Sequence, residues 1–283
     1  MGGFVKMIYK RILIPSFVAV GGAICLLGYI KLHNYHSWAE EKTIIYKERE
    51  KIPDDTLRVV WIGDSWAAYH QSQDTTLASM LRNRLNRPIS VRSSGMVGAK
   101  TKAIYELMHD TSSHIGTQKL LEDLPDYCVI SAGINDAVAK IGPQNYCYHY
   151  SLILKQLISN GITPICIDMP DVDYASVFQK EPLTMKVRHW VSNIVHKTSL
   201  WSFTDYRKAL KHELSCNNNK KIIYIDATIW NKDGYKDKRH LYLTDKIHLN
   251  NTGYHLLDSV IVSKIEKDLS RSTTSNEIQK ARN

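Results

Sequence analysis

The sequence predicts an α/β protein in which helices cover both faces of a parallel β-sheet. Short runs rich in apolar and β-branched residues alternate along the chain with segments whose apolar residues recur at helical spacing. Several of those runs are apolar at nearly every position, which is typical of strands buried on both faces. The chain has 283 residues, 43% hydrophobic and 23% charged, and can bury one such domain. We therefore expect a three-layer α/β domain.

Charge and metal-ligand content exclude two classes of protein. Residues 1–51 hold 8 basic and 4 acidic residues and residues 271–283 hold 3 and 1, which leaves 26 and 23, a net charge of +3, for residues 52–270. A nucleic-acid-binding body needs a basic patch, so we expect no nucleic-acid partner. The five cysteines are too few for a disulfide scaffold, and the 12 histidines are scattered without metal-ligand spacing. We expect neither a metal ion nor a cofactor.

The N-terminal segment has the composition of a membrane anchor. Residues 12–30 contain no charge, and as a helix they would extend about 28 Å, close to the thickness of a hydrocarbon core. No signal-peptidase site follows, because the next residues are KLHNY. Lys6, Lys10 and Arg11 precede the span, which places residues 1–11 in the cytoplasm. The sequence therefore predicts a single-pass membrane protein whose main domain is extracytoplasmic, either periplasmic or extracellular.

The segments on either side of the body are polar. Residues 31–56 mix both charges, and we expect a stalk or linker there. Residues 270–283 have almost no apolar content, and we expect a disordered tail. We expect the body between them, residues 57–269, to form the main folded domain.

The elements of the body follow in order. The candidate strands are residues 57–62, 89–91, 127–132, 162–169 and 221–225, and the candidate helices are residues 76–85, 148–159 and 252–267. Asn160 and Gly161 end the second helix in the manner of a C-terminal cap. Residues 170–219 are long for a connection between strands and carry Trp190 and Trp201, so we expect a helical insertion that shapes the substrate site.

Four short motifs lie where ligands of open parallel sheets bind, beyond the carboxyl ends of the strands. They are GDSW at 63–66, SGMVG at 94–98, GIND at 133–136 and DKIH at 245–248. A serine hydroxyl is a weak nucleophile that a histidine base activates near neutral pH. An aspartate three residues before the histidine is able to bond its far nitrogen. Glycine amides and an asparagine amide are suitable donors to an oxyanion. The motifs together indicate acyl transfer.

With these motifs the chain resembles the SGNH hydrolases, also called the GDSL-like esterase and lipase family. The family's blocks correspond to Ser65 in GDSW, Gly98 in SSGMVGAKT, Asn135 in GIND and His248 in DKIHLN. The resemblance implies that Ser65 is the nucleophile, His248 the base and Asp245 its orienting acid. It also implies an oxyanion hole made by the Ser65 and Gly98 amides and the Asn135 side chain. The family fold is a flavodoxin-like sandwich of five parallel strands.

The substrate is less closely defined. Trp66 stands where many members of the family have leucine, and we expect it to form the pocket wall. Trp190 and Trp201 are suited to stacking on sugar rings. We expect a serine esterase that removes O-acetyl groups from an envelope or secreted polysaccharide. An O-acyltransferase to a glycan, a lysophospholipase or an acyl-thioesterase would use the same site.

Overall fold

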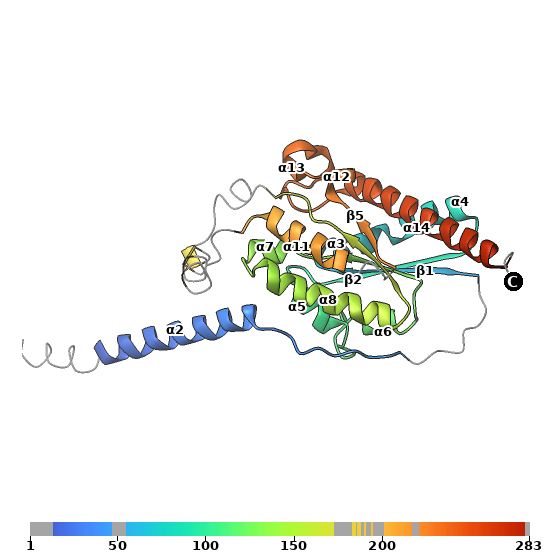
Figure 1. Cartoon of the computed structure of the whole chain (residues 1–283). Coiled ribbons are helices and arrows are strands. Elements are labelled where there is room, and N and C mark those ends of the chain that lie inside the picture. The colour runs from blue at the N-terminus through green and yellow to red at the C-terminus, as the bar shows by residue number, and fades with distance from the viewer. Residues whose placement is uncertain are drawn as a thin grey trace, which may run out of the picture.

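The computed structural model describes residues 14–46, 55–172, 201–216 and 221–280, together with residues 183, 184, 186, 187, 190 and 194. The predicted cytoplasmic N-terminus, residues 1–11, lies outside the described residues. Within these ranges the chain forms the three-layer α/β fold that the sequence predicts (Figure 1).

The central sheet has five strands, all paired in parallel, in the order β2-β1-β3-β4-β5. The strands are β1 (Leu57–Gly63), β2 (Ile89–Gly95), β3 (Tyr127–Ser131), β4 (Thr163–Ile167) and β5 (Ile223–Ile225). Every residue of β3 and β4 is buried, which explains why both strands are apolar at nearly every position. In this order β2 and β3 lie on opposite sides of β1. The direction in which strands are added therefore reverses between β1 and β3, and this place is the topological switch point of the sheet.

Two groups of helices cover the sheet. One face carries α5 (Thr101–Leu107), α8 (Pro143–Ser159) and α11 (Phe203–Cys216), which pack side by side. The other carries α4 (Asp74–Leu85) and α14 (Asn251–Lys280) (Figure 1). The short elements are α3 (Ser65–His70), η2 (Gln71–Gln73), α6 (Gln118–Leu121), α7 (Ile134–Val138), α12 (Ala227–Trp230), α13 (Gly234–Asp237) and η4 (Arg239–Leu241). Asn160 and Gly161, the latter with φ +72°, end α8 as predicted.

The N-terminal part of the chain forms a helix followed by an extended segment, and the extended segment differs from the predicted stalk. Residues Ile14–His36 form the helix α2. In the part of the chain that the structure describes, no helix is long and apolar enough to cross a membrane. After α2, residues 37–46 do not hang free as a stalk but lie along α5 and α8 in extended conformation (Figure 1). We call residues 37–46 the strap.

Side chains of α5 and α8 hold the strap by its backbone. The Ala39 N–H donates to Nε2 of His149 (2.9 Å), and the Ile44 N–H donates to Oε1 of Gln156 (2.9 Å). The Lys42 N–H donates to the Tyr105 hydroxyl (2.6 Å), and Tyr46 is buried. The polar side chains of α8 therefore satisfy backbone groups that a free stalk would leave to water.

Two further expectations for the chain are corrected. The C-terminal helix α14 continues to Lys280, so residues 270–280 are helical and not a disordered tail. No glycine or proline interrupts that segment, so the last turns of the helix extend beyond its apolar stripe. The insertion at 170–219 ends in α11, whose Tyr206 and Leu210 are buried against the core. That half of the insertion belongs to the fold.

Candidate active site

The nucleophile motif lies at the switch point of the sheet. Strand β1 ends at Gly63, whose φ is +155° and whose Cβ, if it had one, would lie 2.2 Å from the Ser131 carbonyl oxygen. Glycine is thus required where β1 passes closest to β3. Asp64 caps α3 by accepting the Trp66 N–H (3.0 Å), and Ser65 is the first residue of that helix.

The histidine reaches Ser65 from a loop before α14. An antiparallel bridge between Tyr242 and Leu249 closes this loop, and the Leu243 N–H donates to the His248 carbonyl (2.8 Å). Nε2 of His248 lies 2.8 Å from Oγ of Ser65, and its Nδ1 lies 2.7 Å from Oδ2 of Asp245. If the neutral imidazole carries its proton on Nδ1, that N–H donates a hydrogen bond to Asp245. Nε2 then has a free lone pair that accepts the Ser65 hydroxyl proton.

Asp245 is held in the charged form. Its partial burial alone would raise its pKa, but the N–H groups of His248 and Ile247 and the His248 ring together lower that pKa below its ordinary value. The other carboxylate oxygen, Oδ1, accepts both N–H groups at 2.9 Å. The carboxylate is thereby fixed in orientation beside the imidazole.

The three predicted oxyanion donors lie around the same point of the sheet edge. In the described part of the chain, no hydrogen-bond partner is found for the backbone N–H of Ser65 or of Gly98. Gly98 has φ +78°, a region that other residues rarely adopt, so this turn requires glycine. Nδ2 of Asn135 donates to the Ala99 carbonyl (3.0 Å) and makes a longer contact with Asp64 (3.4 Å).

The structure adds Asp136 to the site, a residue of the GIND motif to which the sequence analysis assigns no role. Its Oδ2 accepts the backbone N–H (3.0 Å) and the hydroxyl (2.9 Å) of Thr101, at the start of α5. Burial raises the pKa of Asp136 to about 6. These two hydrogen bonds join the segment that carries Gly98 to the segment that carries Asn135. No sequence spacing relates Asp136 to Thr101, so their pairing could not be predicted.

Asp64 is the second buried carboxyl group beside the nucleophile. It is 2% exposed, and burial raises its pKa to about 7. Its Oδ1 accepts the Trp66 N–H and its Oδ2 contacts Nδ2 of Asn135, so Asp64 lies between α3 and Asn135.

Trp66, which the sequence predicts to form the pocket wall, lines a small cavity beside Asp64. It is 2% exposed, and its Nε1–H donates to the carbonyl of Ile247 (3.3 Å), the residue before His248. The Tyr254 hydroxyl donates to the Trp66 carbonyl (3.0 Å) from α14. The buried Trp66 therefore connects α3 to the loop that carries His248. Tyr69 takes the exposed position instead, with its ring edge-to-face on that of His248 at 4.8 Å.

The two tryptophans of the insertion have different surroundings. Trp201 is half-buried and packs on Gly142, where a Cβ would lie 2.7 Å from its ring. It is therefore part of the packing and not a free stacking surface. Trp190 is 65% exposed. Of the three tryptophans predicted to bind substrate, Trp190 alone presents its ring to solvent.

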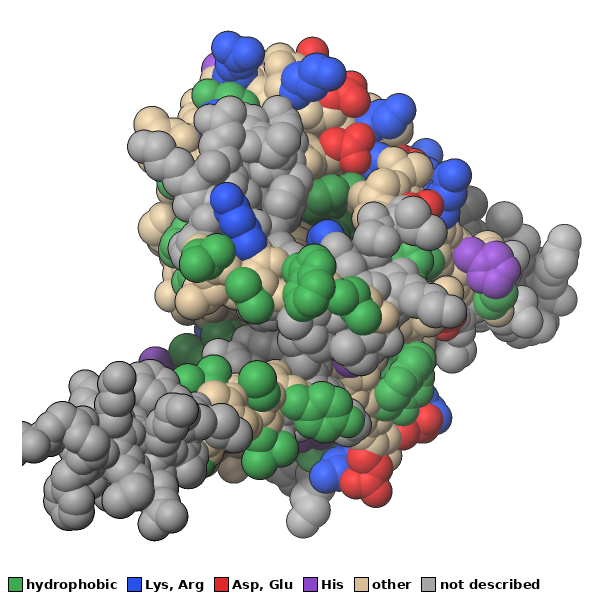
Figure 2. Space-filling view, turned by 90° about the vertical axis from the view of Figure 1, so that its left-hand side faces the viewer, with side chains coloured by type: hydrophobic (Ala, Val, Ile, Leu, Met, Phe, Trp, Pro, Cys, Tyr) green, Lys and Arg blue, Asp and Glu red, His purple; other side chains and the backbone are tan. Residues whose placement is uncertain are grey.

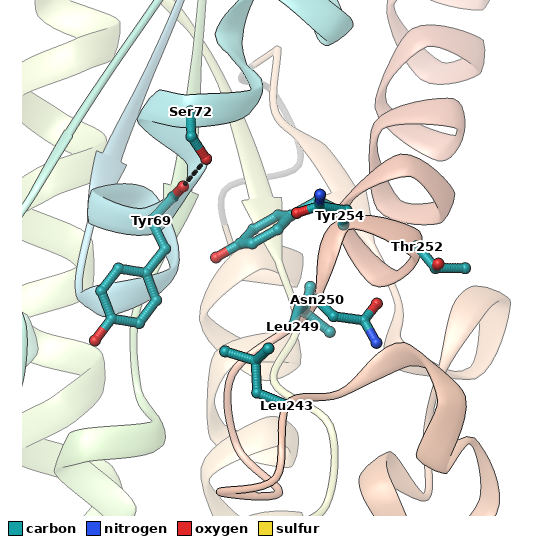
Figure 3. A pocket seen from close by; sticks show the side chains of 8 residues that line it. Tyr69, Ser72, Leu243, Leu249, Asn250, Thr252 and Tyr254 are labelled. Carbon is teal, nitrogen blue, oxygen red and sulfur yellow. Dashed lines mark hydrogen bonds between the residues drawn. The ribbon is translucent and has the colours of Figure 1, made fainter.

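A hollow of about 500 Å³ opens beside the histidine loop, between the end of α3 and the start of α14 (Figure 3). Hydroxyl, amide, aromatic and aliphatic side chains line it: Tyr69, Ser72, Leu243, Leu249, Asn250, Asn251, Thr252 and Tyr254. A second cavity, lined by Asp64, Trp66, Ile134 and Met169 among others, holds only about 10 Å³. Among the described residues, no group of three or more His, Cys, Asp or Glu side chains is placed to hold a metal ion.

Solved structures of low sequence identity share the fold. A lipase/acylhydrolase from Enterococcus faecalis superposes with a TM-score of 0.51 at 19% identity, over 75% of this chain and 96% of the other. The esterase EstA from Pseudoalteromonas sp., in a structure inhibited by monoethylphosphonate, gives 0.51 at 14% identity over 75% and 98%. A variant of Axe2, an acetyl xylan esterase from Geobacillus stearothermophilus, gives 0.51 at 14% identity over 74% and 94%.

No match is found among curated protein sequences. Residues 59–259, however, match the profile of the GDSL-like lipase/acylhydrolases, and this span contains all four motifs of the sheet edge. The chain therefore belongs to the GDSL-like lipase/acylhydrolase family and is a carboxylic ester hydrolase.

Proposed function

We propose that this enzyme is a serine esterase that removes short acyl groups, chiefly acetyl, from a carbohydrate of the cell envelope or a secreted polysaccharide. The observation that carries the proposal is the chain of contacts from Ser65 through His248 to Asp245, at 2.8 and 2.7 Å. Nucleophile, base and orienting acid are arranged in this way in serine hydrolases of unrelated folds.

The proposed reaction proceeds in two halves. Oγ of Ser65 attacks the ester carbonyl carbon while Nε2 of His248 takes the hydroxyl proton. The oxyanion accepts hydrogen bonds from the amides of Ser65 and Gly98 and from Asn135. The intermediate collapses, the C–O bond breaks, and His248 returns the proton to the departing alcohol. Water then attacks the acyl-enzyme with His248 as base, and the acid and free Ser65 are released.

The two cavities favour a short acyl group on a polar alcohol. The cavity next to Asp64 and Trp66 is no larger than a water molecule requires, so it offers no room for a fatty acyl chain. The hollow beside Tyr69 is wide and lined with hydroxyl and amide groups, which suits the polyhydroxylated part of the ester. The acetyl xylan esterase among the structures of similar fold is compatible with this assignment.

We also propose that residues 12–30 anchor the enzyme, with the catalytic domain outside the cytoplasmic membrane. The proposal rests on 19 consecutive uncharged residues and on the cations that precede them. The apolar side chains described in this range are exposed: Val20, Ile24, Leu26, Leu27 and Tyr29.

The replacement Ser65→Ala tests the proposed reaction. We expect kcat for nitrophenyl acetate and for acetylated oligosaccharides to fall on the order of 10⁴-fold, the usual result when a serine triad loses its nucleophile. Ser259→Ala, whose hydroxyl bonds the Leu256 carbonyl on α14, is the matched control and should retain activity. Activity of Ser65→Ala within tenfold of the wild type would remove Ser65 from its role.

Chain-length preference separates the proposed activity from a lysophospholipase or thioesterase. Nitrophenyl acetate should be hydrolysed at least tenfold faster than nitrophenyl octanoate, a difference of about 1.4 kcal/mol in transition-state binding. A preference for octanoate would show that a fatty acyl chain is accommodated, and it would favour the lipase alternative.

A further inference from the structure

Exposed apolar side chains gather at one edge of the sheet. Outside α2, the strap and the insertion after β4, the described large hydrophobic residues that are at least 40% exposed follow the carboxyl ends of strands or lie in the histidine loop: Tyr69 after β1, Val97 after β2, Ile229 after β5 and Leu243 beside His248. We call these four residues the apolar rim. The rim surrounds the same edge that carries Ser65, Gly98 and Asn135.

The insertion after β4 adds to this surface. Its described residues Leu183, Val187, Trp190 and Ile194 are helical and between 51% and 75% exposed. The insertion leaves the sheet after β4 and returns at Trp201, which packs on Gly142 at the start of α8. Figure 2 views this side of the molecule and shows hydrophobic side chains across it. Single exposed apolar residues are common, but a group on one face marks an interaction surface.

The strap fixes α2 to this edge of the domain. Helix α8 joins two parallel strands, β3 and β4, so it runs back from the carboxyl edge to the amino edge. Asn145, near its start, donates to the carbonyl of His36, the last residue of α2 (3.1 Å). Asn160, at its end, accepts the Tyr46 N–H (2.7 Å). These contacts span 15 positions of the chain, about 22 Å of helix, so the strap cannot pivot about one point.

An aromatic residue marks the junction of α2 and the domain. Trp38 is 57% exposed and packs edge-to-face on Tyr148 of α8, with centroids 4.7 Å apart. Tryptophan is enriched at the level of lipid headgroups in anchored proteins. Figure 1 shows α2 leaving the molecule on the side to which the strands point.

We propose that the carboxyl edge of the sheet rests on the bilayer that holds α2, so that the enzyme takes acetyl esters carried on membrane lipids, such as an O-acetylated glycolipid. The inference rests on the anchoring and esterase activity proposed above. A bilayer is the occupant because the strap brings the end of α2 to the same sheet edge that carries the rim, and the described apolar side chains of α2 are exposed. The lipid part of the substrate stays in the membrane, which agrees with the absence of a fatty acyl cavity beside Trp66 in the described residues.

Site-specific fluorophores measure this contact directly. The full chain, with Cys25→Ala and Cys216→Ser to remove its exposed thiols, receives one new cysteine at Ile229→Cys or Val187→Cys. Asn83→Cys, exposed in the last turn of α4 at the amino edge, is the control. Each variant is labelled with a polarity-sensitive dye and reconstituted in vesicles of phosphatidylethanolamine and phosphatidylglycerol that contain brominated lipids.

The outcomes separate this inference from the proposals beneath it. Blue-shifted, quenched emission at 229 and 187, but not at 83, supports the inference. Protein that floats with the vesicles while all three dyes stay in water contradicts it. Protein that does not float with the vesicles contradicts both the anchor and the inference. Loss of nitrophenyl acetate hydrolysis in a control without vesicles would instead contradict the esterase proposal. Dye–dye interaction between two copies of the chain, without quenching by brominated lipid, would show that the carboxyl edge of the sheet is a dimer interface. That result would overturn the inference.

Kinetics give an independent measurement. Val187→Ser with Ile194→Ser should lower turnover of an O-acetylated dialkyl glucoside in vesicles roughly tenfold, equivalent to about 1.4 kcal/mol of lost interfacial binding, and leave nitrophenyl acetate unchanged. Ile45→Ser is the matched control, because Ile45 is 65% exposed but lies at the far end of the strap. Equal rates on the vesicle substrate for all these proteins would overturn the inference.

Discussion

At the scale of single residues, the site depends on side chains that never reach the substrate. Trp66 binds the carbonyl before His248, Tyr254 binds the carbonyl of Trp66, and Asp136 binds Thr101. Each contact links two segments far apart in the sequence. The 2.8 Å contact between Ser65 and His248 is therefore set by a network that the motifs themselves do not reveal.

Asn135 contributes to catalysis through the oxyanion in the proposed mechanism. Asn135→Ala should lower kcat for nitrophenyl acetate on the order of 10²–10³-fold with little change in KM, because one donor to the developing charge is lost. Steady-state kinetics measure both constants. A rise in KM at unchanged kcat would show that Asn135 binds the ground state instead.

Asp64 should make stability depend on pH. Its pKa is about 7 in the folded protein and near 3.8 when exposed, so between pH 4 and 7 the folded state binds more protons than the unfolded state. The free energy of unfolding therefore falls as the pH rises through this window. Asp64→Asn keeps an oxygen acceptor for the Trp66 N–H but cannot ionise.

The melting temperatures of this variant and the wild type, compared at pH 4 and pH 8, test the assignment. The free energy of unfolding of the variant, relative to that of the wild type, should be higher at pH 8 than at pH 4. The change should be on the order of 1–4 kcal/mol, since one pKa unit corresponds to about 1.4 kcal/mol. A difference that does not change with pH would mean that burial does not raise the pKa of Asp64 in the folded protein.

At the scale of elements, the strap belongs to the domain. Its Tyr46 is buried in the main core, and removal of the whole strap would leave the polar groups of His149, Gln156 and Asn160 without their backbone partners. Burial holds His149 in the neutral form that accepts the Ala39 N–H and lowers its pKa to about 4.

Two truncations test the importance of the strap. A chain that begins at residue 37 should melt at the temperature of the full chain in detergent. A chain that begins at residue 55 should melt at least ~5 °C lower, because it loses a buried tyrosine and several hydrogen bonds, about 2–4 kcal/mol in sum. Calorimetry measures both. Equal melting temperatures for the two truncated chains would show that the strap contributes no stability.

The sequence predicts the regular elements well because their signals are local. Alternating apolar strands and helices predict all five strands, and the four motifs predict which residues gather at the sheet edge. The strap could not be predicted, because residues 37–46 are held by side chains of α8 more than 100 positions away. Trp66 shows the same limit: its type is visible in the sequence, but its burial depends on Ile247 and Tyr254.

At the scale of the whole molecule, α2, the strap and the active-site edge form one arrangement. The strap carries α2 to the carboxyl edge, and the apolar rim faces the same side. The full chain should therefore sediment with membranes and resist extraction by carbonate, whereas the chain that begins at residue 37 should remain in the supernatant. Recovery of the full chain in the supernatant would contradict the proposed anchor.

Covalent trapping shows whether Ser65 is the nucleophile of an acyl-enzyme mechanism. The purified enzyme is incubated with an alkyl fluorophosphonate, digested, and the adduct is located by mass spectrometry. We expect one phosphonate per chain, bound to Oγ of Ser65, loss of esterase activity in step with labelling, and no adduct in Ser65→Ala. An adduct on another residue, or an active esterase that the reagent neither labels nor inhibits, would contradict the account.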